Sequence, residues 1–304
     1  MTANIVDRPD EILNSNLFVD LSKSFNHQTF LKIEGMNFSG SIKLKAARWM
    51  LDDLEQRGQI TSETTLIESS SGNLGVALAM ICASRNIRFI CVVDANSSAQ
   101  KVRKIKAYGA EVVQITNPDD NGGFLGSRIK YIQDYVSNNP NTIWINQYKN
   151  EMNWGSHELS TAREIFESFP HIDYLYVGVG TGGTLKGIAE YLRKTNLITK
   201  VIAVDSMGSI TFGGKPGPRR IPGLGASVKP HHFCFTQAFA CVNIDEHQAV
   251  ESCKKFARQG YYFGGSTGTI LAAIEHCKIP KNENDIVVCI SPDMGDSYGD
   301  IVYI

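Results

Sequence analysis

Short runs of β-branched and other apolar residues alternate along the chain with longer segments of mixed polarity. The apolar runs have the length of buried strands, and they are TFLKI (29–33), TTLIE (64–68), IRFICVV (87–93), EVVQI (111–115), TIWI (142–145), YLYVGV (174–179), VIAVD (201–205) and DIVVCI (285–290). The longer segments repeat apolar residues at the 3.6-residue spacing of an amphipathic helix, and they are KLKAARWMLDDLEQRG (43–58), NLGVALAMICASR (73–85), AQKVRKIKAYG (99–109), GSRIKYIQDYV (126–136) and LKGIAEYLRK (185–194). This alternation is typical of a parallel sheet covered on both faces, so the pattern predicts the α/β fold class.

The chain of 304 residues is long enough for two α/β domains, each with its own core. A change of domain is expected near residues 145–150. The least regular stretch is GGKPGPRRIPGLGASVKP (213–230), which is rich in glycine and proline. Because a long loop within a compact domain is usually functional, we expect this loop to belong to an active site or an interface.

Composition narrows the range of partners. Lys and Arg number 30 against 31 Asp and Glu, a net charge of -1, so no basic field attracts nucleic acid or an anionic membrane. The seven cysteines form no C-x-x-C pair, and the seven histidines show no metal-ligand spacing. No apolar run approaches the ~18 residues of a membrane span, and the N-terminus MTANIVDRPDEI is polar and acidic. We therefore expect a cytoplasmic protein that binds small molecules, without a nucleic acid, membrane or metal partner.

The segment ESSSGNLG (68–75) follows a predicted strand and opens an apolar helix. Its residues Ser70, Ser71, Gly72 and Asn73 leave amides and hydroxyls at the positive end of that helix, where a carboxylate is favoured. An ordinary helix N-cap is the alternative, since serine and asparagine are preferred capping residues. The segment is a candidate carboxylate-binding site.

Two further glycine-rich turns have the same arrangement of strand, turn and helix. In VGVGTGGTLKG (177–187) the candidate phosphate-binding residues are Gly180, Thr181, Gly182, Gly183 and Thr184. This loop lacks the G-K-S/T of a Walker A loop and the spacing of a dinucleotide fingerprint, and a simple tight turn is the alternative. In FGGSTGT (263–269), Ser266 precedes the helical segment ILAAIEHC.

Lys43 follows a Gly-Ser turn in NFSGSIKLKAARW (37–49) and begins a predicted helix. The positive end of a helix lowers the pKa of an amine, as a lysine that forms a Schiff base requires. A solvated surface lysine is the alternative.

Taken in order, five short segments resemble the motifs of the fold type II pyridoxal 5'-phosphate (PLP) enzymes, in the branch of cysteine synthase and cystathionine β-synthase. They are GSIK (40–43), SSGN (70–73), GTGGT (180–184), GGS (264–266) and PDMGDSY (292–298), and they cover about residues 30–300. The resemblance implies two open, twisted, mostly parallel sheets flanked by helices. It also implies a smaller domain at 40–147, a larger one formed by 11–39 with 148–304, and a homodimer.

By this resemblance, Lys43 binds PLP as a Schiff base and moves the substrate α-proton. Asn73 contacts the cofactor, and the loop from Gly180 to Thr184 binds its phosphate. The substrate carboxylate is held by Ser70, Ser71, Gly72 and Asn73. Ser266 faces the pyridine nitrogen. Because a neutral serine cannot keep that nitrogen protonated, the ring is a weaker electron sink, and the substrate is expected to lose its β leaving group to give an α-aminoacrylate.

Within the branch, the chain resembles in particular the N-(2-amino-2-carboxyethyl)-L-glutamate synthases of the 2,3-diaminopropionate pathway, which serves siderophores such as staphyloferrin B. The similar segments are LIESSSGNLGVALAM (66–80), WINQY (144–148), IPGLGAS (221–227), FGGSTGTI (263–270) and PDMGDSY. This resemblance implies replacement of the phosphate of O-phospho-L-serine by the amine of L-glutamate. Gln147 and Tyr148 are expected to contact substrate; Tyr148 stands where sulfur-using relatives carry Phe, and a core tyrosine is the alternative. Arg219 and Arg220 are candidate partners of substrate anions, or else solvated loop residues.

Several positions depart from the cysteine synthase pattern. The residues before the lysine are Phe38-Ser39-Gly40-Ser41, where Pro-Gly-Gly-Ser or Pro-Thr-Gly-Ser is usual, and Gly180 is the choice typical of sulfhydrylases. Sulfide is therefore the alternative nucleophile, in a cysteine synthase acting on O-acetyl- or O-phosphoserine. A non-catalytic paralogue that binds a metabolite or a peptide is a further alternative, against which the presence of Lys43 counts.

Overall fold

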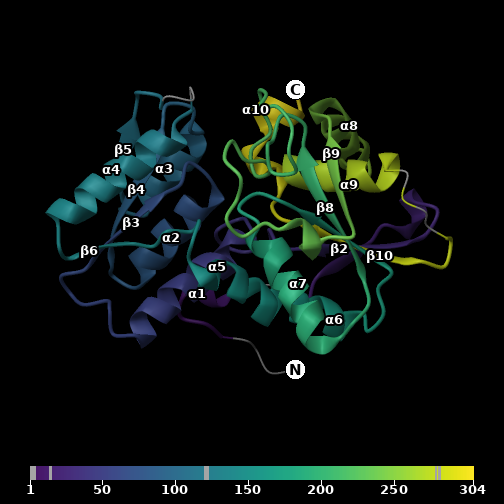
Figure 1. The fold of residues 1–304 in the computed structure, drawn as a ribbon, viewed down its shortest axis with the longest axis horizontal. Helices are drawn as coiled ribbons and strands as arrows, with labels where there is room; N and C mark the ends of the chain where they lie inside the picture. The colour runs from purple at the N-terminus through teal and green to yellow at the C-terminus, as the bar shows by residue number, and fades with distance from the viewer. Residues whose placement is uncertain (1–4, 14–15, 120–122, 278, 280–281) are drawn as a thin grey trace. The chain divides into compact units, whose positions relative to one another are not determined.

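The computed structural model forms two compact units (Figure 1). It describes residues 5–13, 16–119, 123–277, 279 and 282–304. Unit 1 comprises Met1–Leu13, Asn37–Ser39 and Lys43–Met152, and unit 2 comprises Asn14–Met36, Gly40–Ile42 and Asn153–Ile304. The smaller domain was predicted to span residues 40–147. In the structure, the main segment of unit 1 begins at Lys43 and ends at Met152.

Unit 1 is built on a four-stranded parallel sheet with helices on both faces (Figure 1). In spatial order, its strands are β5 (Glu111–Ile115), β4 (Arg88–Asp94), β3 (Thr65–Ser69) and β6 (Thr142–Trp144). Its helices are the short η1 (Pro9–Glu11), α1 (Lys43–Gln56), α2 (Asn73–Ser84), α3 (Ala99–Ala107) and α4 (Leu125–Asn138). Successive strand residues point to opposite faces, so Leu66 packs with α1 and α2 whereas Ile67 packs with Ile132 of α4. Burial of both faces explains the continuous apolar runs of these strands.

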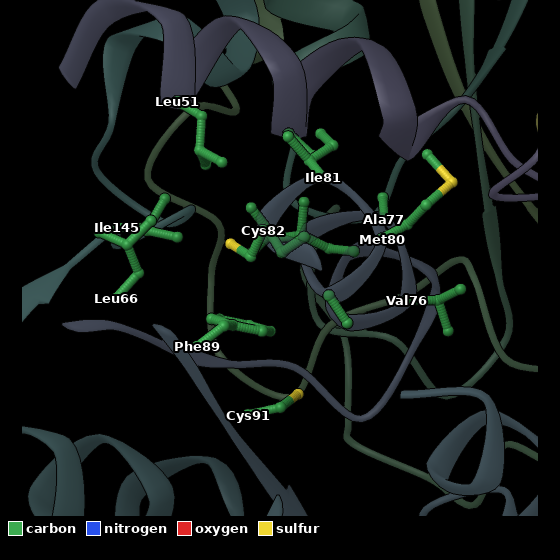
Figure 2. Close-up of a cluster of buried hydrophobic side chains, with 14 of the residues drawn as sticks. Leu51, Leu66, Val76, Ala77, Met80, Ile81, Cys82, Phe89, Cys91 and Ile145 are labelled. Atoms are coloured by element: carbon green, nitrogen blue, oxygen red, sulfur yellow. The ribbon is translucent and has the colours of Figure 1, made fainter. Parts of the chain in front are cut away.

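Helix α2 lies at the centre of the unit 1 core. Residues 74–82 of this helix are all buried, as expected for a helix that is apolar around its whole circumference. Figure 2 shows side chains of α2, among them Met80 and Ile81, together with Leu51 of α1 and Phe89 of β4. This packing fixes the start of α2, which is the candidate carboxylate-binding turn.

Unit 2 contains a six-stranded sheet in which only the first strand is antiparallel to its neighbour. In spatial order, the strands are β1 (Phe18–Asp20), β2 (Gln28–Ile33), β10 (Ile286–Ser291), β7 (Tyr174–Gly178), β8 (Lys200–Ser206) and β9 (Ala240–Ile244). The helices and helical turns are η2 (Ser22–Ser24), α5 (Glu151–Ser156), which begins in unit 1, the π-helical η3 (His157–Ala162), α6 (Arg163–Ser168), α7 (Gly183–Thr195), η4 (Phe235–Gln237), α8 (Glu246–Ala257), α9 (Gly265–His276), η5 (Gly295–Ser297) and α10 (Gly299–Val302). One face of the sheet packs against α9, and the other packs against α6 and α7.

The predicted α/β class is confirmed. The last residue of each of the eight predicted strands lies within one position of the last residue of an observed strand. The sequence did not predict β1 and β9. Both are edge strands with mostly half-buried side chains, so neither has the continuous apolar run of a central strand.

No helix in the described part of the chain is long and apolar enough to cross a membrane. Among the same residues, no group of three or more His, Cys, Asp or Glu is arranged to hold a metal ion. No disulfide joins cysteines in the described part of the chain.

Candidate cofactor and substrate site

The glycine-rich loop of unit 2 joins the end of β7 to the start of α7. Gly182 has φ +84°, in the left-handed region, and a Cβ there would lie 3.0 Å from the Phe233 amide nitrogen. A Cβ on Gly183 would lie 2.5 Å from Asn153 Oδ1. Only glycine therefore allows the loop to lie this close to its neighbours. The first amides of a helix have no partner within the helix, and the 13 residues of α7 make this end a suitable phosphate site.

Two polar side chains from the preceding helical segment contact the threonines of this loop. Asn153 Nδ2 donates to Thr181 Oγ1 at 3.3 Å. His157 is buried in the π-helical η3, where its Nε2 lies 3.3 Å from Thr184 Oγ1 and its Nδ1 lies 3.0 Å from Thr161 Oγ1. Asn153 and His157 lie just beyond WINQY, and no role was predicted for them from the sequence. These two residues thus contact the hydroxyls of Thr181 and Thr184 in the candidate phosphate loop.

Ser266 lies in the first turn of α9, where it is 1% exposed. Its hydroxyl donates to Asp293 Oδ1 at 2.7 Å, and Tyr298 Oη donates to Asp293 Oδ2 at 2.7 Å. Burial, reinforced by the negative charge of Asp293, raises the pKa of Tyr298 well above its usual value, so the phenol stays protonated. PDMGDSY (292–298) was identified as a motif from the sequence. The sequence did not predict that Asp293 of this motif accepts hydrogen bonds from Ser266 and Tyr298.

The segment that leads to Lys43 is paired with the same part of unit 2. Ser41 forms an antiparallel bridge with Asp293, and the Ile42 amide donates to the Pro292 carbonyl at 2.7 Å. Lys43 itself is the first residue of α1, in unit 1, and is half-buried. The backbone before the candidate Schiff-base lysine is thus fixed by the residues that hold Ser266.

In unit 1, the candidate carboxylate turn connects β3 to α2. Ser70 Oγ accepts the Gly75 amide at 2.9 Å and the Gly72 amide at 3.4 Å, so this hydroxyl stabilises the turn as a helix-capping serine does. Ser71, Gly72 and Asn73 are half-buried at the start of α2.

Glu68 connects this turn to the segment that carries Gln147 and Tyr148. Its fully buried carboxylate accepts the Ser69 amide at 2.8 Å and the Gln147 amide at 3.1 Å. Ser69 O in turn accepts Gln147 Nε2 at 2.9 Å and Tyr148 Oη at 3.3 Å. Burial raises the pKa of Glu68 to about 7, and hydrogen bonds, that of the Gln147 amide first, oppose the shift. The two segments predicted to contact substrate are therefore held together, by a residue that the sequence did not single out.

The two candidate loop arginines differ in their surroundings. The guanidinium of Arg219 donates to Gly208 O at 2.6 Å, to Ala226 O at 3.3 Å and to Ser227 Oγ at 3.0 Å. Arg220 is exposed. Arg219 thus holds its own loop together, and its contact with a substrate anion stays a prediction.

Both units therefore present glycine- or serine-rich turns at helix starts, where unpaired amides can bind an anion. The chain belongs to the family of pyridoxal-phosphate dependent enzymes, whose pattern matches residues 17–293.

Three solved structures resemble the chain over nearly its whole length. An O-acetylserine dependent cystathionine beta-synthase from Helicobacter pylori is 27% identical, with a TM-score of 0.90 over 99% of this chain and 100% of that one. O-ureido-L-serine synthase is 26% identical, with a TM-score of 0.87 over 97% of this chain and 94% of that one. A hydrogen sulfide-producing enzyme from Fusobacterium nucleatum is 27% identical, with a TM-score of 0.89 over 97% of this chain and 99% of that one.

The residues of unit 2 fit pyridoxal phosphate. A phosphate requires amides unobstructed by side chains, and Gly182 and Gly183 lie where a Cβ would press on neighbouring atoms. A pyridine nitrogen requires a buried polar partner, and Ser266, which is 1% exposed, is such a group.

Proposed function

We propose that this protein catalyses β-replacement on an O-activated L-serine, and specifically that it converts O-phospho-L-serine and L-glutamate to N-(2-amino-2-carboxyethyl)-L-glutamate and phosphate. This product would serve 2,3-diaminopropionate synthesis for a siderophore or a related metabolite. The observation that carries the reaction class is the similarity, over 97–99% of the chain, to enzymes named for O-acetylserine and O-ureido-L-serine. Both names describe a serine whose side-chain oxygen carries a substituent.

The proposed roles follow from the positions of the residues. When bound, the cofactor would supply an electron sink for charge that develops at the substrate α-carbon. Lys43 Nζ would carry it and would accept the α-proton. The amides and hydroxyls from Gly180 to Thr184 would hold the phosphate, with Asn153 and His157 orienting the threonines. Ser266 would face the ring nitrogen.

Unit 1 would bind the amino acid. Ser71 and Asn73 would contact the substrate carboxylate at the start of α2, where the helix dipole favours an anion. Ser70 and Gly72 would shape this turn, as the contact from Ser70 Oγ to the Gly75 amide indicates. Asn73 would also contact the cofactor.

The reaction requires balanced proton transfers. The α-proton leaves for Lys43 and the bond from the β-carbon to oxygen breaks, releasing phosphate. The glutamate nitrogen then forms a bond to the β-carbon and loses a proton, and the α-proton is restored. Gln147 and Tyr148 would lie beside the substrate, and burial raises the pKa of Tyr148, so its hydroxyl stays a neutral donor.

Sulfide is the second candidate nucleophile, and a specific observation favours it. Gly180 is typical of sulfhydrylases, and a Cβ there would lie 3.1 Å from Gly223 O, so a bulkier residue would press on that loop. One of the similar structures is a hydrogen sulfide-producing enzyme.

A competition experiment decides between the two nucleophiles. Purified enzyme is given O-phosphoserine or O-acetylserine with glutamate or sulfide, and products are identified by mass and compared by kcat/KM. The proposal predicts the highest kcat/KM for O-phosphoserine with glutamate. A clear preference for sulfide would identify a cysteine synthase, and an absence of product with every pair would favour the non-catalytic alternative.

We further propose that the protein is a cytoplasmic homodimer, as the family resemblance implies. Sedimentation equilibrium would then give twice the 33.5 kDa mass of the chain. A mass of 33.5 kDa at micromolar concentration would contradict this.

A further inference from the structure

Arg219 lies half-buried in the glycine- and proline-rich loop that follows β8, within unit 2. Its guanidinium donates to Gly208 O at 2.6 Å, to Ala226 O at 3.3 Å and to Ser227 Oγ at 3.0 Å. The first acceptor stands 11 positions before the arginine, and the other two stand 7 and 8 positions after it. One side chain therefore joins the beginning of the loop to its end.

The carbonyl oxygens that accept from Arg219 also bind backbone amides of the same loop. Gly208 O accepts the Gly217 amide at 3.0 Å, and Ala226 O accepts the Ile210 amide at 3.0 Å. A carbonyl oxygen has two lone pairs, so each of these oxygens can serve an amide and the guanidinium together. Gly208 has φ +82°, and a Cβ there would lie 3.0 Å from the Gly217 carbonyl carbon, so the two segments cross closely. The guanidinium thus completes a group of acceptors that the loop itself brings together.

A buried acid lies close to this guanidinium. A Cβ on Gly225 would lie 2.9 Å from Arg219 Nε and 3.3 Å from Asp205 Oδ1, so glycine at this position leaves room for both groups. Asp205 is fully buried, and burial raises its pKa. Hydrogen bonds from Ser209 and Thr211 oppose this shift, and so does the positive charge of Arg219. A cation in the loop therefore offsets part of the cost of burying the acid.

The end of this loop packs behind the candidate phosphate loop. The Gly225 amide donates to Val179 O at 3.0 Å, at the residue before Gly180. A Cβ on Gly180 would lie 3.1 Å from Gly223 O, so the two backbones are in close contact. Ala226, which accepts from the arginine, follows directly. A shift of residues 223–226 would consequently reach the start of the phosphate loop.

We propose that Arg219 is a positioning residue, which holds residues 208–227 in the conformation that supports the candidate phosphate loop, and that it does not bind a substrate anion. The proposal rests on the proposed function, in which Gly180 to Thr184 hold the cofactor phosphate. It separates Arg219 from its exposed neighbour Arg220, which stays a candidate partner of substrate anions. Loss of the Arg219 guanidinium should therefore weaken cofactor binding and leave substrate binding to the loaded enzyme unchanged.

The first measurement is the affinity of the apoprotein for pyridoxal phosphate, by fluorescence titration. Arg219→Ala is expected to weaken this affinity about tenfold or more, because contacts from a charged donor are lost. Millimolar guanidinium chloride should restore most of the affinity, since the free ion can bind the same carbonyl oxygens, whereas sodium chloride at equal concentration should not. Lys215→Ala removes an exposed cation from the same loop and should bind cofactor as wild type does.

The second measurement separates positioning from contact with substrate. With cofactor in excess, Arg219→Ala is expected to release phosphate from O-phosphoserine with the wild-type KM. A substrate-anion partner would give the opposite pattern, in which cofactor affinity is that of wild type and the KM for O-phosphoserine is raised. That pattern would overturn the proposal.

Arg219→Lys keeps the test decisive even if Arg219→Ala fails to fold. Lysine keeps the charge but loses the planar fork of donors, so a cofactor affinity between those of wild type and Arg219→Ala is expected, again improved by guanidinium. Wild-type affinity in Arg219→Lys, or no response to guanidinium, contradicts the role of Arg219 and leaves the proposed function intact. Wild-type protein that binds no cofactor, or that releases no phosphate from O-phosphoserine, contradicts the proposed function itself.

Discussion

At the scale of single residues, Glu68 shows how one buried acid can hold two segments of the chain together. Its two oxygens hold the Ser69 and Gln147 amides, which belong to separate segments of unit 1. A fully buried carboxylate resists ionisation, and the pKa of Glu68 is accordingly raised from 4.5 to about 7. The cost of this arrangement should be measurable as a dependence of stability on pH.

We predict that Glu68→Gln removes a pH-dependent loss of stability. The folded-state pKa lies above the unfolded value, so the native state binds the proton more tightly. Stability from this group is therefore full below about pH 4.5 and falls as the pH rises to about 7, by about 3 kcal/mol in total. Urea denaturation at pH 5.0 and 7.5 should show this loss in wild type and not in the variant. The control is Glu63→Gln, an exposed site that should keep the wild-type difference; an equal difference in all three proteins would contradict the prediction.

His157 provides a second test at this scale. His157→Ala removes the partner of Thr184 Oγ1, and loss of one hydrogen bond of about 1 kcal/mol should weaken cofactor affinity about fivefold. Fluorescence titration of the apoprotein with cofactor gives the affinity. His171→Ala, at a histidine with a side chain 70% exposed, should bind as wild type does. Unchanged affinity in His157→Ala would show that Thr184 needs no orientation.

The residues that the sequence did not single out share a physical property. Asp293 meets Ser266 from 27 positions away, and Glu68 meets Gln147 from 79 positions away. Local spacing predicts which residues share a turn or a helix face, and it carries no information on pairs formed across the fold. The sequence accordingly predicted the turns and Lys43 from local patterns and the family resemblance, but not the buried acids that support the turns.

At the scale of elements, the glycine loop before α7 depends on backbone geometry. Gly182 and Gly213 both have φ +84°, but a Cβ at Gly213 would meet nothing within 4 Å, whereas one at Gly182 would press on Phe233 and His232. The pair therefore separates backbone strain from steric contact.

We predict that Gly182→Ala is more damaging than Gly213→Ala. The left-handed conformation alone costs about 1 kcal/mol or somewhat more in each variant, and only Gly182→Ala adds displacement of the phosphate loop. Equilibrium denaturation and cofactor titration should show a modest loss of stability in both variants, with loss of cofactor affinity confined to Gly182→Ala. Equal affinities would place the phosphate elsewhere.

Strands that are buried on both faces were predicted more accurately from the sequence than half-buried edge strands. Central strands such as β3 and β4 are covered on both faces, so their apolar runs identified them to within one residue. The edge strand β9 is mostly half-buried and gave no such run. The π-helical η3 contains Ser160 and Thr161, and its irregular hydrogen bonding leaves no simple 3.6-residue period.

At the scale of the whole molecule, the chain is a pyridoxal-phosphate dependent enzyme made of two α/β units. Unit 2 provides the glycine loop and the buried cluster around Asp293, whereas unit 1 provides Lys43 and the turn that starts α2. In the proposed chemistry, unit 2 would hold the cofactor phosphate and ring nitrogen, and unit 1 would supply the lysine and bind the substrate carboxylate.

The most direct test of the central claim is phosphate release from O-phosphoserine, measured together with the visible absorption of the bound cofactor. We predict a yellow protein whose absorption band shifts when O-phosphoserine is added, as phosphate is released, with continued release when glutamate is present. Lys43→Ala should give neither change, and Lys106→Ala, at an exposed lysine in unit 1, should behave as wild type. A colourless protein that stays colourless with added cofactor, or phosphate release that persists in Lys43→Ala, would contradict the account.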